Sequence, residues 1–336
     1  MLRQYAGAPA GDGRRAAAGS LIPAVPGGRP LKVGVQLPEV EREVRWRELL
    51  DMTRAIEDLG YDSVWAGEHL LYRWADRPAR GPWEAWTLLA AIAASTSRIE
   101  LGPLVACTNF HNPALLAKQA ATLDEISSGR LILGLGAGWN ETEFRAFGYP
   151  FDHRIDRFEE AFTIIRTLLQ DGAIDFDGRF YQARDCELLP RGPRVTGPPL
   201  MIGSKGPRML RIALPHVQAW NVWFSDTGNE PSGVPAMREL VDAACRDVGR
   251  DPADVERTVA VQVRLPGGKG RVQGAYAQPE FAPLEGAPAE VADVLRAYAR
   301  EGIGHVQVVM DPITIESIRA FAPVLAELDR TGQVLP

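Results

Sequence analysis

A glutamate and a histidine follow one another directly after a short apolar run that is typical of a buried strand. Glu68 and His69 come just past the segment 62–66. Histidine has an ordinary pKa near neutrality, so its ring can accept or donate a proton under physiological conditions. The ring could also serve only to hydrogen-bond a ligand, and a surface-loop histidine without function is the alternative. The pair predicts acid–base chemistry at His69.

Glycines alternate with other residues in a second run, Gly134–Glu141, after another strand-like segment. Glycine lets a ligand approach the backbone closely, because it has no side chain. The run lacks the full GxGxxG spacing of a dinucleotide-binding loop, and it does not follow the first strand. Gly136, Ala137 and Gly138 are therefore candidate ligand-binding positions, and a tight turn of packed glycines is the alternative.

A third run joins small residues to the start of a helix. Gly203, Ser204, Lys205 and Gly206 precede Pro207, and proline is favoured at the first position of a helix. Free backbone N–H groups and the helix dipole at such a start favour an anion, and Ser204 and Lys205 add further donors. The run predicts a phosphate-binding loop, with an ordinary capped helix start as the alternative.

Strand-like and helix-like segments alternate from Leu31 to the end of the chain, and this order positions the three runs. The expected strands are 31–37, 62–66, 98–105, 131–135, 200–203, 217–223, 258–264 and 305–310. The expected helices are 45–59, 84–95, 113–127, 153–170, a helix from Pro207, 236–248, 288–300 and 313–328. Eight strands that alternate with eight helices predict an α/β fold, a (β/α)8 TIM barrel, rather than an open doubly wound sheet. In such barrels the active site lies at the carboxyl ends of the strands, which is where the three runs fall.

A non-helical insertion is expected after the fourth strand and its helix. It covers residues 172–198 and contains a hairpin that turns at Gly178. Long insertions in compact domains are often functional lids. We therefore expect this insertion and the loop 265–286 to cover a bound substrate.

The composition sets limits on the domain organisation and on the partners. Residues 1–30 are rich in Ala, Gly, Pro and Arg and are predicted to be a disordered tail, so that residues 31–336 form one barrel domain. The tail lacks the apolar stretch of a signal peptide, and no apolar run approaches the ~18 residues of a transmembrane helix. Cys107, Cys186 and Cys245 form no CxxC pair, which favours a reduced, cytoplasmic setting. No spacing of histidines and cysteines predicts a metal site, and a net charge of −6 without a basic stripe argues against a nucleic-acid partner.

Five strings of sequence, in this order, are similar to those of the luciferase-like monooxygenase superfamily, in its branch of coenzyme F420-dependent or flavin-dependent oxidoreductases. The strings are Tyr61–Leu70, Thr96–Val105, His111–Gln119, Ser128–Glu141 and Ile202–Arg208. The resemblance covers residues 31–330, and the five strings are far more specific to the superfamily than to one reaction.

The resemblance implies a barrel with an insertion after strand four and a set of site residues. It implies a non-prolyl cis peptide at Leu104–Val105, which would lie behind the central ring of the cofactor. It also implies that His69 lies beside the reactive edge of the ring, that Asn140 contacts the cofactor, and that the strand-five loop binds a phosphate. The catalytic residue expected is His69. The cofactor-binding residues expected are Glu68, Leu104, Val105, Ala106, Gly136, Ala137, Gly138, Asn140, Gly203, Ser204, Lys205 and Gly206.

Departures from the superfamily patterns bear on the choice of cofactor. Many F420 members have an aspartate where this chain has Glu68, and the sugar-phosphate dehydrogenases carry a catalytic glutamate where it has Trp139. Bacterial luciferases place an arginine for the FMN phosphate where it has Ala137 and Gly138. We favour hydride transfer between F420 and a small organic substrate stacked on the ring. An FMN-dependent monooxygenase that uses oxygen is the alternative, and the substrate and proton donor stay unassigned.

Two further classes of function compete with the oxidoreductase interpretation. A non-catalytic cofactor-binding protein would keep the cofactor contacts but would not depend on His69 for turnover. A cofactor-free isomerase or aldolase would need a lysine or a metal cluster at the strand ends, where only Lys205 falls, inside the expected phosphate loop. Members of the superfamily are often dimers, so a homodimer is one expectation.

Overall fold

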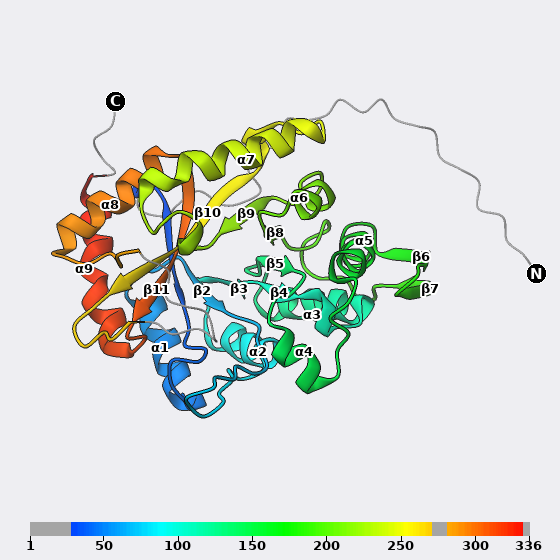
Figure 1. The fold of residues 1–336 in the computed structure, drawn as a ribbon, viewed down its shortest axis with the longest axis horizontal. Helices are drawn as coiled ribbons and strands as arrows, with labels where there is room; N and C mark the ends of the chain where they lie inside the picture. Colours follow the sequence, from blue (N-terminus) through cyan, green and yellow to red (C-terminus); the bar gives the residue numbers. More distant parts are fainter. Residues whose placement is uncertain (1–27, 271–280, 332–336) are drawn as a thin grey trace, which may run out of the picture.

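The computed structural model describes residues 28–270 and 281–331 of the chain (Figure 1). Its main sheet is parallel and consists of β1 Lys32–Gln36, β2 Ser63–Ala66, β3 Glu100–Pro103, β4 Ala106–Cys107, β5 Leu133–Gly136, β8 Leu200–Gly203, β9 Ala219–Val222, β10 Glu256–Arg264 and β11 Ile303–Asp311. The strand order is β3-β2-β1-β11-β10-β9-β8-β5-β4. Leu101 of β3 pairs with Leu131 just ahead of β5, so the two ends of the sheet meet. The predicted barrel is confirmed.

The expected third strand, 98–105, is observed as the shorter β3, and a second short strand, β4, follows just beyond its predicted end. β3 and β4 are separated by a cis peptide between Leu104 and Val105, which is the non-prolyl cis bond that the resemblance implied. β3 pairs with β2, whereas β4 pairs with β5. This second short strand is why nine strands are observed where eight were predicted.

Helices surround the strands (Figure 1). They are α1 Trp46–Asp58, α2 Ala85–Ser95, α3 Pro113–Ile126, α4 Glu141–Phe147, α5 Arg154–Asp171, α6 Pro207–Ala213, α7 Val234–Asp247, α8 Pro288–Arg300 and α9 Ile315–Thr331. Eight correspond to predicted helices, and α4 was not predicted. α3 begins as expected, because the side chain of Asn112 accepts a hydrogen bond from Leu115 N at 3.1 Å.

Apolar side chains fill the layer between strands and helices, and the barrel interior combines apolar side chains with buried polar ones such as Asn221 and Gln307. All five residues of β1 are buried, as expected of a parallel strand that is covered by helices on one side and lies around a packed interior on the other. Inside the barrel Trp65, Ile132 and Met201 pack together. Outside it, helices contribute side chains such as Ile56 of α1, and the resulting layer fixes the strand ends that carry the site.

The insertion forms a hairpin, as predicted, but it does not cover the barrel mouth. β6 Ala173–Asp177 and β7 Gln182–Glu187 pair antiparallel and project outward beyond α5 (Figure 1). Glu160 of α5 accepts hydrogen bonds from the backbone N–H groups of Arg179, Phe180 and Tyr181, which holds the turn against that helix. The expectation that residues 172–198 act as a lid is therefore wrong in this structure, because the hairpin is bound to the outer layer.

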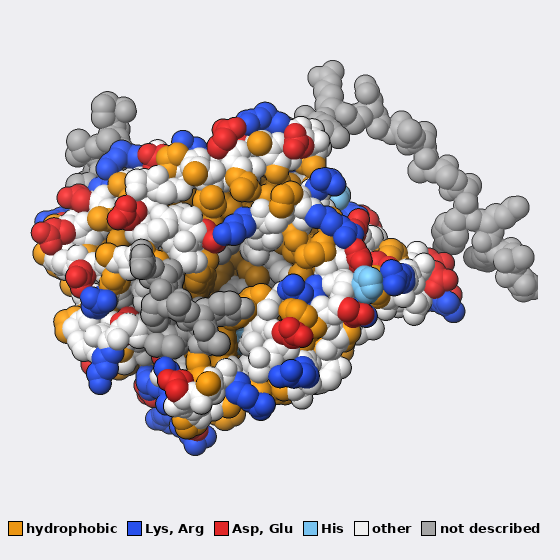
Figure 2. Space-filling model, in the orientation of Figure 1, with side chains coloured by type: hydrophobic (Ala, Val, Ile, Leu, Met, Phe, Trp, Pro, Cys, Tyr) orange, Lys and Arg blue, Asp and Glu red, His pale blue; other side chains and the backbone are white. Residues whose placement is uncertain are grey.

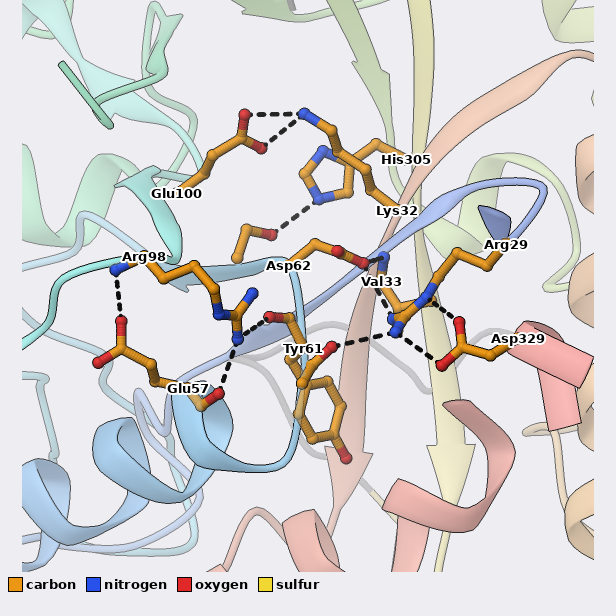
Figure 3. A network of polar contacts seen from close by, with 12 residues as sticks. Arg29, Lys32, Val33, Glu57, Tyr61, Asp62, Arg98, Glu100, His305 and Asp329 are labelled. Atoms are coloured by element: carbon orange, nitrogen blue, oxygen red, sulfur yellow. Dashed lines mark hydrogen bonds and ion pairs between the residues drawn. The ribbon is translucent and has the colours of Figure 1, made fainter. Parts of the chain in front are cut away.

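Polar side chains connect the segments at the amino ends of the strands (Figure 3). Arg29 forms ion pairs with Asp62, ahead of β2, and with Asp329 of α9, at 3.1 and 2.8 Å. Lys32 lies 2.7 Å from Glu100 in the same network. Residues 1–27 of the predicted tail lie outside the described residues, but the tail prediction is wrong for Arg29, because its buried guanidinium joins both ends of the barrel domain.

Candidate active site

A cavity of about 710 Å³ opens at the carboxyl ends of the strands. Figure 2 shows a hollow in the middle of this face with hydrophobic side chains inside it. All but one of the predicted site residues line the cavity, namely Glu68, His69, Leu104, Val105, Ala106, Gly136, Ala137, Gly138, Gly203, Ser204, Lys205 and Gly206. The structure thus brings the three runs of the sequence around one space.

Asn140 is the predicted residue that does not line the cavity. Its side-chain amide donates a hydrogen bond to the carbonyl of Leu71 at 3.0 Å, and the residue stands at the start of α4. Trp139, one position earlier, lines the cavity instead. The position of Asn140 therefore does not support the predicted contact with a cofactor, because its amide is directed to the loop after β2.

His69 is held by a buried glutamate that the sequence did not single out. The carboxylate of Glu143 lies 2.9 Å from Nδ1 of His69, and the Glu143 side chain is 1% exposed. The other carboxylate oxygen of Glu143 accepts hydrogen bonds from the backbone N–H groups of Leu70 and Leu71. Glu143 belongs to α4 and lies in sequence far from His69. The position of Glu143 shortly after the glycine run was a signal in the sequence that it could lie near the site, but only the fold brings Glu143 and His69 together.

The environment of His69 has opposing effects on its pKa. Burial alone would lower the pKa of the imidazole, because it disfavours the charged ring. The hydrogen bond to Glu143 and the charges of Glu39, Glu143 and Glu68 act in the other direction, and together they raise the pKa of His69 above its ordinary value. His69 is accordingly suited to hold a proton at the mouth of the barrel.

Glu68 has a structural role despite its place beside His69. One oxygen of its carboxylate accepts hydrogen bonds from Trp86 Nε1 at 2.9 Å and from His111 Nε2 at 2.8 Å. The other oxygen accepts from the backbone N–H of Cys107 at 2.6 Å. Glu68 therefore joins the loop after β2 to α2 and to β4, and its acceptor capacity is directed at protein donors.

The glycines of the second and third runs make room for the side chain of Val105. A Cβ at Gly136 would lie 2.9 Å from Val105 Cγ2, and one at Gly203 would lie 3.0 Å from Val105 Cγ1. Gly138 has a φ of +75°, which favours glycine for a separate reason. Gly136 and Gly203 thus pack against Val105 and also line the cavity, so their contact with a ligand stays a prediction.

The loop after β8 contains two polar side chains that line the cavity, Ser204 and Lys205, and the charge of Lys205 is balanced by a neighbouring aspartate. Lys205 forms an ion pair with Asp226 at 2.5 Å, and its side chain is 58% exposed. The Ser204 hydroxyl accepts a hydrogen bond from Gly206 N at 3.2 Å, which shapes the turn before α6. Arg208 points elsewhere, since it pairs with Asp156 and Glu159 of α5.

Aromatic rings surround His69. The ring of Trp139 lies edge-on to the imidazole at a centroid distance of 5.5 Å, and the ring of Tyr72 lies 4.7 Å from it. Across the cavity, Trp223 and Phe224 pack together at 4.6 Å. A planar ligand in this cavity would therefore contact aromatic rings and would lie near the ionisable side chain of His69.

Two more charged residues line the cavity that the sequence reasoning missed. Glu39 lies against the backbone of Gly67, where a Cβ would lie only 1.4 Å from its Oε1. Arg154, at the start of α5, donates a hydrogen bond to the carbonyl of Gly138 at 2.5 Å. In residues 28–270 and 281–331, no group of three or more histidine, cysteine or acidic side chains is arranged to hold a metal ion. No helix in those residues is long and apolar enough to cross a bilayer.

A parallel α/β barrel with an acid–base residue in a ligand-sized cavity at its carboxyl end defines an enzyme-like site of the TIM-barrel class. Residues 29–265 match the luciferase-like monooxygenase family, and the chain belongs to that family.

Curated relatives and solved structures agree with this family. An F420-dependent glucose-6-phosphate dehydrogenase of Amycolatopsis mediterranei is 31% identical over 225 residues, which cover 65% of each chain. A 5,10-methylenetetrahydromethanopterin reductase of Archaeoglobus fulgidus is 29% identical over 68% of this chain and 63% of its own length. In both comparisons the chain spans slightly less than two thirds of the relative.

The similarity to solved structures concerns the fold. The structure of an F420-dependent secondary alcohol dehydrogenase with an F420-acetone adduct has a TM-score of 0.74 at 20% identity, over 89% of this chain and 99% of the other. A coenzyme F420-dependent tetrahydromethanopterin reductase from Methanopyrus kandleri has a TM-score of 0.69 at 19% identity, over 90% and 97% of the two chains. A monooxygenase from Streptomyces bottropensis has a TM-score of 0.71 at 21% identity, over 88% and 99%.

Proposed function

We propose that this protein is an oxidoreductase that binds the deazaflavin F420 and transfers a hydride between it and a small organic substrate. The observation that carries the proposal is His69, which lines the same cavity as Leu104, Val105 and the loop after β8 and is held by Glu143. The names of the two curated relatives support the choice of cofactor.

The residues present fit such a cofactor. The cavity of about 710 Å³ lies within the range of ordinary small-molecule sites. Ser204 and Lys205 offer donors that could bind a phosphate in place of the Lys205 contact to Asp226, while Leu104, Met209 and Trp223 offer apolar surface to a ring. These two halves of the lining match a molecule that has a planar ring at one end and an anionic group at the other.

The chain's own residues would bind and orient the cofactor and would exchange a proton with the substrate. When bound, the deazaflavin supplies or accepts the hydride. His69 would transfer the accompanying proton through Nε2, because Glu143 occupies the Nδ1 side of the ring. The apolar side chains of Leu104, Ile155 and Met209 would limit the access of water.

An FMN-dependent monooxygenase is the second candidate, and Arg154 is the observation that favours it. Arg154 belongs to α5, but its guanidinium donates to the carbonyl of Gly138 in the loop after β5. An arginine in this place could bind the phosphate of FMN, which the sequence of the loop alone did not provide for.

Turnover with each reduced cofactor separates the two candidates. Purified protein is mixed without oxygen with reduced F420 and a panel of ketones, aldehydes and activated alkenes, and the oxidation of F420 is followed by its fluorescence. Reduced FMN is supplied in parallel with oxygen, and oxygen consumption above the protein-free rate is measured. Oxidation of F420 that depends on one class of substrate supports the proposal. Substrate-dependent oxygen consumption with FMN alone contradicts it.

Two variants test whether the protein is catalytic or only binds the cofactor. His69→Ala is expected to bind F420 with near wild-type affinity and to lose turnover by roughly a hundredfold, the usual contribution of a positioned proton donor. His216→Ala is the matched control, because His216 does not line the cavity. Equal turnover in His69→Ala and wild-type protein would contradict the role of His69.

A further inference from the structure

Carboxylates surround His69 on several sides. Glu143 of α4 contacts Nδ1 directly, and Glu68 precedes His69 in the chain. Glu39, in the loop after β1, lies against Gly67 in the loop that carries His69. All three side chains belong to residues that are at least nine-tenths buried, and all three line the cavity. Negative charge near an imidazole favours its doubly protonated form, and it does so more strongly in a buried site than in water.

Other titratable and charged groups lie near these carboxylates. His111 donates to Glu68 from the side of α2 and α3. Burial raises the pKa of the Cys107 thiol well above its usual value, so this neighbour is neutral. Of the described cationic residues that line the cavity, Arg154 is hydrogen-bonded to Gly138 and Lys205 is paired with Asp226.

Glu143 also determines which nitrogen of His69 is available. Its Oε2 accepts from the N–H groups of Leu70 and Leu71, at 2.8 and 3.3 Å, and its Oε1 lies 2.9 Å from Nδ1. Because an ionised carboxylate only accepts hydrogen bonds, Nδ1 must carry the hydrogen in this pair. Nε2 is therefore the nitrogen that remains for a ligand in the cavity.

We propose that Glu143 is a positioning residue that holds the hydrogen of His69 on Nδ1 and favours the protonated ring, so that Nε2 is the nitrogen that exchanges a proton with a ligand in the cavity. This inference rests on the proposed function, in which a carbonyl group is one acceptor of the hydride. The carbonyl carbon accepts a hydride from the reduced deazaflavin, and the π electron pair moves to the oxygen. The oxygen takes the proton from Nε2, which yields an alcohol, the oxidised cofactor and a neutral His69 that keeps its hydrogen on Nδ1.

The effect of the surroundings on the pKa of His69 has the sign that this proposal needs. Burial by itself lowers the pKa, but the hydrogen bond to Glu143 and the charges of Glu39, Glu143 and Glu68 outweigh it and raise the pKa. The imidazolium then persists to a higher pH than in a free histidine. Glu143 raises the pKa of His69 both through its hydrogen bond and through its charge, so neutralising Glu143 should lower that pKa.

The direct test is an NMR titration of the protein without cofactor, labelled with 15N-histidine. The His69 signals are assigned by their loss in His69→Asn. In the wild type we expect His69 to titrate above the ordinary histidine range and, once neutral, to carry its hydrogen on Nδ1. In Glu143→Gln we expect the titration to move to lower pH and the preference for the Nδ1 hydrogen to weaken, and Glu143→Asp should restore part of both.

Glu160→Gln is the matched control, because Glu160 also accepts several backbone N–H groups but holds the hairpin far from His69. It should leave the His69 titration unchanged. A wild-type His69 that titrates at or below the ordinary range overturns the proposal whatever the variants do, and so does a Glu143→Gln titration identical to that of the wild type.

Kinetics separate this inference from the proposed function. With reduced F420 and a carbonyl substrate, the alkaline limb of the kcat profile should move to lower pH in Glu143→Gln, with at least a tenfold loss of kcat on the alkaline side and an unchanged Kd for F420. Titrations as expected in a protein that does not bind F420 would support the positioning by Glu143 and contradict the function proposed for the site. F420 turnover with a kcat profile that Glu143→Gln does not move would contradict the positioning alone.

Discussion

Adjacent residues at the end of β2 have different tasks. Glu68 accepts three hydrogen bonds from protein donors and is 6% exposed, so its environment is complete without a ligand. His69 has one nitrogen held by Glu143 and lines the cavity with the rest of its ring. Sequence placed both residues at the barrel mouth, but it could not say which one holds the structure together, because the donors to Glu68 come from distant parts of the chain.

Substitutions of this pair should separate stability from chemistry. Glu68→Gln turns one acceptor oxygen into an amide donor among N–H donors, so we expect it to lower the free energy of unfolding by about 2 kcal/mol. His69→Asn breaks one contact to a buried carboxylate, so we expect it to lower that free energy by about 1 kcal/mol, less than Glu68→Gln, and to act mainly on turnover. Urea unfolding of both variants is the measurement. A larger loss of stability in His69→Asn than in Glu68→Gln would contradict this division.

The elements around the bulge form one packed unit. The Leu104–Val105 bulge between β3 and β4 places Val105 against glycines of β5 and β8. The strands themselves were predictable, because continuous apolar runs mark strands buried on both faces. The helix α4 was not, since its seven residues show no repeating apolar pattern and only Glu143 and Phe144 are buried. The contact of Asn140 with a cofactor stays a prediction, and at the start of that helix its amide donates to the carbonyl of Leu71.

A double-mutant cycle tests the contact between Val105 and the glycines. Gly136→Ala places a Cβ 2.9 Å from Val105 Cγ2, whereas the next nearest atoms are 3.9 Å away. We expect a loss of about 1–3 kcal/mol in unfolding free energy, as for other overpacked sites. Val105→Ala in the same chain should recover part of that loss, and the two changes should be non-additive. Strict additivity would mean that the glycine serves another purpose, such as contact with a ligand.

At the scale of the whole molecule, the two ends of the barrel differ in role. The carboxyl end carries the cavity, while the amino end carries a buried polar network in which Arg29 joins β2 to α9 (Figure 3). The alternation of strands and helices was enough to predict the barrel. It was not enough to predict the network, or the outward position of the 172–198 hairpin, because both depend on contacts between residues far apart in sequence. The homodimer stays a prediction.

The amino end should make stability depend on pH through Glu256. Burial raises the pKa of Glu256 to about 7, with Lys32 opposing the shift. A carboxyl group whose pKa is raised in the folded state stabilises the fold most when protonated, so its contribution is lost as pH rises from the ordinary value of 4.5 through about 7. This pH-dependent loss of unfolding free energy, up to about 3 kcal/mol, should be absent in Glu256→Gln.

Unfolding of wild type and Glu256→Gln in urea at several pH values measures this effect. The variant should gain stability relative to the wild type between pH 5 and pH 8, and the gain should level off above the folded-state pKa. Glu160→Gln, on the outer face of α5, is the control for the loss of a glutamate charge. A difference between wild type and Glu256→Gln that does not change with pH would contradict the assignment of the raised pKa to this residue.

The cavity at the carboxyl end of the barrel should bind F420, and a titration of the protein with the cofactor measures this without any substrate. Purified protein is titrated with F420 and, in parallel, with FMN, and the quenching of fluorescence gives a Kd for each. We predict a Kd for F420 on the order of micromolar and no saturable binding of FMN. Tight binding of FMN without binding of F420 would contradict this prediction and would make the oxygen-dependent monooxygenase the better account.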